Sequence, residues 1–471
     1  MKRIFLFLLG GLFFAGSHAQ QNMTLYQMHD ILQSNSLNPS VASDCRWNVG
    51  FPLLGSISAA GSTPVTYKKL GIDNGSINVD DVLPSLKKTN LLSANANINI
   101  LAIGYRAENT YFQFTVNERF SAALAVSKDL MDVALNGNSS YLGQTIEGKI
   151  GLSTLYYREY GINVAHDFGD DTWFGGRVKL LFGRFGIHSP DNKISLYSDP
   201  GTSSLDLSSD LLLRASIPGY AIFNGSGLVD DFKTELESSD FIFNPSNVGV
   251  ALDLGINKTF DDGWKVSASV LNIGLVSWTK NTHVLSQQST FSYNGPTLGA
   301  NDWGDFADTL KSALNLNYKI DEPFSQWLSP AVMFGVNYPV ADYVRVGVTG
   351  YGEFNPVGMP WALSATALTD NISNFYGAVS YTVTNNSFVN IGVGLGAKLG
   401  PFNIHAITDN VLALVDYSSQ KYGTLQFGIN FKFGCGDSGG SGKRRIRSVP
   451  CPSYGGYGSM KSIPCSSSKR R

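Results

Sequence analysis

The strongest constraint in this sequence is a strict two-residue alternation of apolar with polar or small side chains. Between residues 248 and 257 the apolar positions are Val248, Val250, Leu252, Leu254 and Ile256, and Gly, Ala, Asp, Gly and Asn lie between them. Successive side chains of a β-strand point to opposite faces, so this segment predicts a strand with one apolar and one polar face. Asp253 lies in the middle of the polar face, which therefore cannot face lipid.

The same alternation recurs on both sides of short turn sequences, which predicts antiparallel hairpins. Such turns are expected at residues 107–109, 261–263, 339–342 and 385–386. Gly263 permits the positive φ that a tight hairpin requires. In the hairpin expected around residues 107–109, Asn95, Asn97 and Asn99 share one face of the first strand.

The last alternating segment ends on an aromatic residue, as the closing strand of a bacterial barrel commonly does. Its apolar positions are Leu425, Phe427, Ile429, Phe431 and Phe433. We expect the barrel to close at Phe433. Less regular segments at residues 47–58, 151–168, 173–186 and 205–222 bring the prediction to about 14 strands, an even number as such barrels require.

The N-terminal residues have the pattern of a secretory signal peptide. Lys2 and Arg3 precede the apolar stretch 4–14, and small residues at Ser17 and Ala19 fit cleavage before Gln20. No cysteine follows closely enough to carry a lipid anchor. Elsewhere no apolar run reaches the roughly 18 residues of a membrane-spanning helix. Any membrane span must therefore be built from strands.

The composition of 50 Gly, 28 Phe and 21 Tyr with 15% charged residues suits many short strands joined by turns. A water-soluble β-sandwich is the alternative that this composition leaves open. We predict an all-β fold, a closed antiparallel transmembrane β-barrel with short helices and a disordered basic C-terminal tail. The expected divisions are a signal peptide (1–19), an N-terminal periplasmic or plug segment (20–45), the outer-membrane barrel (46–434) and a cysteine-containing basic periplasmic tail (435–471).

Two segments between strands have helical spacing, residues 80–88 and 305–316. Asp305 is a candidate N-cap of the second, with Phe306, Leu310 and Leu314 along one side. Short helices packed on the barrel are favoured over helices that bind a partner.

Four cysteines occur, at Cys45, Cys435, Cys451 and Cys465, and they allow three complete pairings. The first and last strands of a closed barrel are neighbours, Cys45 precedes the first, and Cys435 follows the last. We therefore hypothesise one disulfide between Cys45 and Cys435 across the seam and another between Cys451 and Cys465 within the tail. A metal site in the tail is disfavoured, because no C-x2-C pair and no nearby histidine is present.

The formal net charge is −2, but the charges are unevenly placed, with an acidic body and a basic tail. The tail's proposed partner-binding residues are Lys443, Arg444, Arg445, Arg447, Lys469, Arg470 and Arg471. Such a segment cannot bury a core. A solvated extension with a small disulfide loop is favoured over a grip on an anionic periplasmic partner.

No catalytic or cofactor-binding pattern emerges. His166, His188 and His405 occur singly within or at the ends of strand-like segments, and the glycine-rich run 392–396 lies inside an alternating strand with no helix after it. Glycine at these positions is expected to relieve crowding in the barrel wall. Acidic pairs fall at turns or at a helix start, with too few ligands for calcium. We expect no enzyme activity, cofactor, metal or nucleic-acid partner.

Four segments resemble the DUF5723 family of Bacteroidetes outer-membrane proteins. They are residues 244–256, 264–278, 400–410 and 427–434, and the Asn-Pro element in residues 37–40 is similar to one near the start of related barrels. The resemblance implies a barrel akin to FadL-like and PorV-like proteins, the latter associated with type IX secretion. The family has no agreed catalytic residues.

Two functions from different classes are therefore expected. The first is a non-enzymatic subunit of a cell-envelope assembly, concerned with type IX secretion, gliding or surface-protein handling. The second is a FadL-like conduit for hydrophobic small molecules, which should have an apolar pocket in its lumen. The expected location is the outer membrane with the tail in the periplasm, and the expected partners are membrane lipid and a periplasmic or outer-membrane protein complex.

Overall fold

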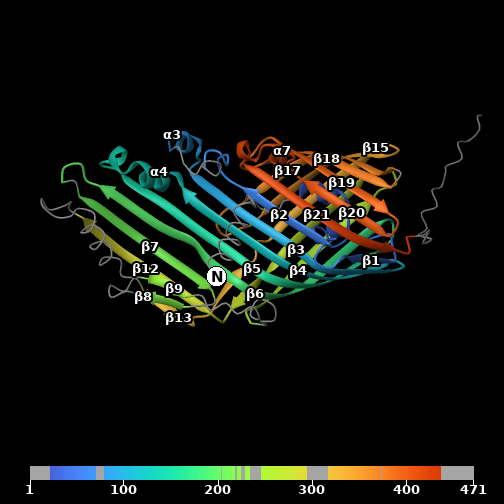
Figure 1. Cartoon of the computed structure of the whole chain (residues 1–471), viewed down its shortest axis with the longest axis horizontal. Coiled ribbons are helices and arrows are strands. Elements are labelled where there is room, and N and C mark those ends of the chain that lie inside the picture. The colour runs from blue at the N-terminus through green and yellow to red at the C-terminus, as the bar shows by residue number, and fades with distance from the viewer. Residues whose placement is uncertain are drawn as a thin grey trace, which may run out of the picture. The chain divides into compact units, whose positions relative to one another are not determined.

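The computed structural model describes residues 22–70, 79–202, 204–217, 220–223, 229–233, 246–293, 317–372 and 374–435. Within these ranges the chain forms a closed antiparallel β-barrel of 14 strands (Figure 1). No helix in the described ranges is long and apolar enough to cross a bilayer.

The barrel sheet contains 19 strand segments. They are β1 (Trp47–Gly50), β2 (Ser56–Ser62), β3 (Thr89–Ala107), β4 (Thr110–Ser127), β5 (Thr145–Asp167), β6 (Thr172–Ser198), β7 (Leu205–Ser216), β10 (Val248–Thr259), β11 (Lys265–Trp278), β12 (Thr282–Tyr293), β13 (Asn317–Ile320), β14 (Phe324–Trp327), β15 (Ala331–Ala341), β16 (Val344–Glu353), β17 (Trp361–Ile372), β18 (Phe375–Thr384), β19 (Asn390–Leu399), β20 (Phe402–Thr408) and β21 (Tyr422–Phe433). A separate hairpin pairs β8 (Tyr220–Phe223) with β9 (Val229–Lys233).

Some of the 14 strands are broken into segments, which explains the larger number of segments. β1 and β2 together form the first strand, and both pair with β21 on one side and β3 on the other. β6 pairs with β10 along one half and with β7 along the other. Beyond them, β11 and β12 together form one more interrupted strand. It pairs with a second, which consists of β13, β14 and β15. The pairing of Trp47 with Phe433 closes the sheet where the sequence predicts closure.

The two faces of the wall differ as the alternation predicts. In β10, Val250 and Leu254 are exposed at 59% and 48%, whereas Asp253 is fully buried. The exposed aromatic side chains near the strand ends are Trp47, Phe168, Phe174, Phe260, Trp264, Tyr338, Tyr343, Phe375, Phe402 and Phe433. An apolar outer band with an aromatic girdle is the surface of an outer-membrane barrel.

The two ends of the barrel have different connections. At one end, here called the turn end, strands are joined by short turns such as residues 107–110, 259–265 and 399–402, with positive φ at Gly263 and Gly400. At the other, the loop end, the connections are longer and carry most of the helices (top of Figure 1). These are α3 (Val79–Val82), η2 (Leu83–Ser85), α4 (Lys128–Asn136), η3 (Ser139–Tyr141), α7 (Leu412–Val415) and η4 (Tyr417–Ser419).

Three local predictions need correction or lie outside the structure. The helix expected over 80–88 is only α3 and one 3-10 turn, because Pro84 cannot continue an α-helix there. Residues 339–341 continue β15 with a register shift instead of forming a turn. The helix expected over 305–316 lies outside the described residues, and α4 has no counterpart in the prediction.

Cys45 and Cys435 form a disulfide, the pair that the sequence analysis places across the seam. Beside it, the Arg46 N–H donates to the Gly434 carbonyl at 3.3 Å. The disulfide therefore joins the chain entering the first strand to the chain leaving the last. Cys451 and Cys465 lie outside the described residues.

Replacing Cys45 and Cys435 together by Ser should leave a folded but less heat-resistant barrel. The bond closes a loop of 390 residues in the unfolded chain, and loss of such a cross-link typically costs about 2–5 kcal/mol. The measurement is the temperature at which the folded band on non-reducing electrophoresis converts to the unfolded one, with Cys451→Ser as the control for a lost thiol. A double variant as heat-resistant as the wild type would contradict this role.

Candidate functional site

The interior of the barrel is occupied by the chain's own N-terminal segment, residues 22–44, here called the plug. It contains α2 (Met23–Gln27) and the 3-10 helix η1 (Leu32–Ser36). All five residues of α2 are buried, and the helix contacts the strands from β15 to β20. A five-residue helix is not stable alone in water, so its contacts with the wall must hold it.

The start of α2 is held by a carboxylate from the wall. Asp409, which follows β20, accepts hydrogen bonds from the Met23 N–H at 3.1 Å and the Thr24 N–H at 2.9 Å. The Thr24 hydroxyl also lies 2.7 Å from that of Ser380 on β18. These bonds satisfy backbone donors that the first turn of a helix leaves unpaired.

Two glutamines of the plug bind inward-facing residues elsewhere on the wall. Gln27 donates to the Thr349 hydroxyl at 2.7 Å and accepts from the Asn337 amide at 2.8 Å. Gln33 and Asn430 exchange two amide hydrogen bonds, of 2.9 and 3.0 Å. Plug contacts therefore reach strands on several sides of the barrel.

One face of the plug, its dry face, packs into an apolar cluster with the wall. The plug contributes Met23, Leu25, Tyr26, Met28, Ile31 and Leu37, and the wall contributes Leu271, Ala331, Met333, Tyr351, Ala362, Leu368, Tyr376, Ala378 and Ile407. Burial of this apolar area stabilises the plug in its position.

Inward-facing glycines make room for the plug. A Cβ added at Gly394 would lie 2.5 Å from the Met28 sulfur, and one at Gly335 would lie 2.7 Å from the Tyr26 ring. Gly392 and Gly394, in the glycine run noted in the sequence, therefore allow the plug to approach the wall closely. Any larger side chain at these positions would collide with the plug.

A network of buried charges lies between the plug and strands β4, β5, β6 and β10. Its ion pairs are Arg119 Nε–Glu159 Oε2 at 2.9 Å, Lys179 Nζ–Glu159 Oε2 at 3.6 Å, Lys179 Nζ–Asp253 Oδ2 at 2.7 Å and Arg177 Nη1–Asp253 Oδ2 at 3.4 Å. Apart from Arg119, these side chains are at most 2% exposed. Buried charges destabilise a fold unless each one is paired.

The plug contributes to this network. Three cations face two carboxylates, and Arg177 donates from Nη2 to the Asn35 carbonyl at 2.9 Å and also to the Asn35 side-chain oxygen. Plug dipoles therefore compensate the remaining positive charge. The sequence identified Asp253 alone, because its partners come from strands far apart in the chain.

Near the turn end, Asp30 of the plug forms an ion pair with Lys398 at 3.1 Å, and its carbonyl accepts from Lys432 Nζ at 2.6 Å. Burial alone would raise the pKa of the Asp30 carboxyl. The two lysines outweigh burial and hold that pKa below its usual value. Asp30 therefore remains ionised at neutral pH.

Two cavities of about 30 and about 100 Å³ lie beside the plug. The larger is lined by polar residues, among them Asn95, Arg119 and Glu353, together with apolar ones such as Leu155 and Met333. Within the described ranges, no group of three His, Cys, Asp or Glu side chains is placed to hold a metal ion.

The structure includes few of the residues selected as candidates from the sequence. Cys45 and Cys435 come together at the seam, whereas the basic tail residues and the other two cysteines lie beyond the described ranges. The anchors Gln27, Asn35 and Asp409 were missed. The sequence analysis gave a plug as one of two possibilities for residues 20–45, and glycines at inward positions of separate strands are the signal that favours it.

A family model described as a family of unknown function, DUF5723, matches residues 39–409. No curated protein matches the chain.

Several solved barrels have a similar fold at low identity. The toluene transporter TbuX of Ralstonia pickettii is 8% identical with a TM-score of 0.40, covering 86% of this chain and 94% of its own. A FadL homologue of Pseudomonas aeruginosa is 8% identical with a TM-score of 0.38, covering 90% and 100%. The translocator domain of the autotransporter NalP from Neisseria meningitidis is 9% identical with a TM-score of 0.28, covering 82% and 88%. No statement about the ligands or partners of this chain follows from these similarities.

Replacing Gly394 by Val should displace α2 from the wall, because the new side chain would meet Met28. Overpacking of this kind costs about 1–3 kcal/mol. Hydrogen exchange of the peptide covering residues 22–44 should become faster. The matched control is Gly352→Val, where an added Cβ is 3.6 Å from its nearest neighbour. Equal exchange in both variants would show that the plug does not depend on this contact.

Replacing Asp253 by Ala should destabilise the barrel strongly, since Arg177 and Lys179 would lose a carboxylate while still buried. Breaking a buried pair typically costs about 3–5 kcal/mol. Asp191→Ala is the control, because its pair with Lys149 is more than half exposed on both sides and should contribute little. Guanidinium unfolding in detergent compares the two. Similar midpoints would contradict the importance of the buried network.

Proposed function

The chain belongs to the DUF5723 family, whose function is unknown, and on that premise we propose that it is a non-enzymatic outer-membrane barrel that serves as a subunit of a cell-envelope assembly. The observation that carries the proposal is the plugged lumen. A barrel whose interior is filled by its own N-terminal segment offers its rims and outer wall as the surfaces on which a protein partner can bind.

The shape of the interior supports this function over a conduit for hydrophobic molecules. A drug-sized ligand typically occupies a pocket of roughly 300–1,000 Å³ that is mostly apolar. Of the two cavities that described residues form beside the plug, the larger has about 100 Å³ and a mixed lining. The large apolar surfaces of the chain are instead on its outer wall, where lipid or a membrane partner would cover them.

We propose that the turn end faces the periplasm, because outer-membrane barrels have their short turns on that side. The Cys45–Cys435 disulfide would then fix the start of the basic tail in the periplasm. In this arrangement the proposed partner contact is made by the tail residues Lys443, Arg444, Arg445, Arg447, Lys469, Arg470 and Arg471. Assemblies for type IX secretion, gliding or surface-protein handling are the classes that the family resemblance suggests.

The test is a pull-down of the tagged full-length protein from native membranes in mild detergent. The comparison chain ends at Gly436, so that it keeps Cys435 and the disulfide at the seam. We expect a stoichiometric partner with the full chain and its loss with the shortened one.

A variant that replaces Lys443, Arg444, Arg445 and Arg447 by Gln is the matched control for charge, and should release the partner at lower salt than the wild type. A barrel that purifies alone with bound apolar ligand would overturn the proposal in favour of the conduit.

A further inference from the structure

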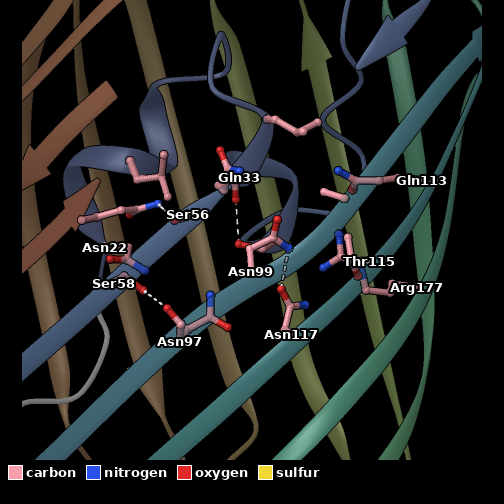
Figure 2. A pocket seen from close by; sticks show the side chains of 15 residues that line it. Asn22, Gln33, Ser56, Ser58, Asn97, Asn99, Gln113, Thr115, Asn117 and Arg177 are labelled. Atoms are coloured by element: carbon pink, nitrogen blue, oxygen red, sulfur yellow. Dashed lines mark hydrogen bonds between the residues drawn. The ribbon is translucent and has the colours of Figure 1, made fainter. Parts of the chain in front are cut away.

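The plug is held differently on its two sides. Its dry face packs into the apolar cluster, whose wall residues lie on β11, β15 to β18 and β20. The opposite side meets inward-facing polar residues of β2, β3 and β4, here called the polar seam: Ser56, Ser58, Asn97, Asn99, Gln113, Thr115 and Asn117. Figure 2 shows these side chains gathered beside Asn22 and Gln33 of the plug. The cavity of about 30 Å³ lies between the plug and this seam.

Several buried oxygen atoms in this region find no hydrogen-bond partner among the described residues. They are Oδ1 of Asn97, Oε1 of Gln113, Oγ1 of Thr115 and Oε1 of Gln426. The last three residues are between 4% and 7% exposed. The Arg177 Nε, a donor beside the same cavity, is also unpartnered within the described chain. A buried polar atom without a partner is destabilising, so these atoms require water or a polar solute.

The available space fits this requirement. A cavity holds a water molecule once roughly 10–15 Å³ is accessible to its centre, and a buried water typically makes about three hydrogen bonds. The smaller cavity exceeds that limit at about 30 Å³, and the larger has about 100 Å³. Asn22, Ser36 and Asn97 line both cavities. The two therefore adjoin, and the larger also reaches Leu271 and Met333 of the apolar cluster.

We propose that the polar seam is a hydrated path for water and small uncharged hydrophilic solutes, which is held closed by the Gln33–Asn430 contact. The seam itself is lined by amide and hydroxyl groups, which bind neutral polar molecules. The nearby Arg119, Arg177 and Lys179 are held in ion pairs with Glu159 and Asp253, and Arg177 also donates to Asn35. This function adds to the proposed assembly role and does not depend on it.

The closing contact links the plug to the first and last strands. Gln33 donates from Nε2 to the Gly55 carbonyl at 2.7 Å and to Asn430 Oδ1 at 2.9 Å, and accepts from Asn430 Nδ2 at 3.0 Å. Gly55 lies in the break between β1 and β2, and Asn430 lies opposite Gly50 on β1. The dry face of the plug makes none of these bonds. Loss of the Gln33–Asn430 contact should therefore open the polar seam while the dry face keeps the plug attached.

The first experiment measures how fast a small water-soluble reagent reaches the polar seam. Full-length Thr115→Cys and Ser58→Cys barrels are reconstituted in liposomes and treated with the small neutral reagent 2-hydroxyethyl methanethiosulfonate. Ala378→Cys, a wall position in the apolar cluster, is the matched control. The wild type gives the background reaction of the native cysteines. Each variant is made with and without Gln33→Ala, and we expect both seam variants to react at least ten times faster than Ala378→Cys once Gln33 is replaced. Equal rates would overturn the proposal, and the use of two seam variants guards against one that fails to fold.

The second experiment measures passage. Liposome swelling in arabinose is compared for wild type, Gln33→Ala and Gln27→Ala, each checked for folding by its heat-dependent electrophoretic shift. Gln27 is the matched control, because it makes similar bonds to Thr349 and Asn337 on the dry side. We expect swelling to rise several-fold with Gln33→Ala only. No increase, or an equal increase in both, would overturn the proposal. Purified barrel in liposomes contains no partner, so neither result bears on the assembly role.

Discussion

The rest of this structure depends on the requirement that every backbone polar group within lipid be paired inside the protein. Closure of the sheet by β1 and β2 against β21 meets that requirement at the seam. It also creates an enclosed interior lined by the second face of every strand. The side chains on that face are polar or small because the apolar ones face outward. An interior of this kind must hold water, a ligand or another part of the chain, and here it holds residues 22–44.

The plug is therefore a component of the barrel's interior. Asp409 is buried with its oxygens directed to the first turn of α2, and Arg177 is buried with Asn35 as one of its partners. Without the plug, both groups would need water in place of these bonds. The inward glycines add a steric match, since Gly394 and Gly335 leave space where Met28 and Tyr26 lie. Electrostatics and packing thus specify the same position for the plug.

The sequence predicts the wall much better than its contents. Alternation is a local property, so the strands, the inward direction of Asp253 and closure at Phe433 follow from it directly. To predict the disulfide between Cys45 and Cys435, one further rule is enough: the first and last strands of a closed barrel are neighbours. The partners of Asp253 and the anchors of the plug are contacts between distant segments, which no local pattern encodes. Residues 339–341 show the limit even within the wall, because the sequence predicts a turn there, whereas β15 continues through Pro339 with a register shift.

The plug is attached differently on its two sides, and this difference allows one barrel to bind a partner and to change the hydration of its interior. On the dry-face side the plug is held by apolar packing together with the hydrogen bonds of Asp409 and Gln27, so its attachment there does not rest on one contact. The Gln33–Asn430 contact is directional and is made by few atoms. A small displacement on that side therefore breaks its hydrogen bonds while most of the apolar contact on the other side persists. The outer wall and the turn end are unaffected by such a movement, because the Cys45–Cys435 disulfide holds the end of the plug at the seam. A surface that binds a partner and an interior that changes its hydration can thus act independently in this chain.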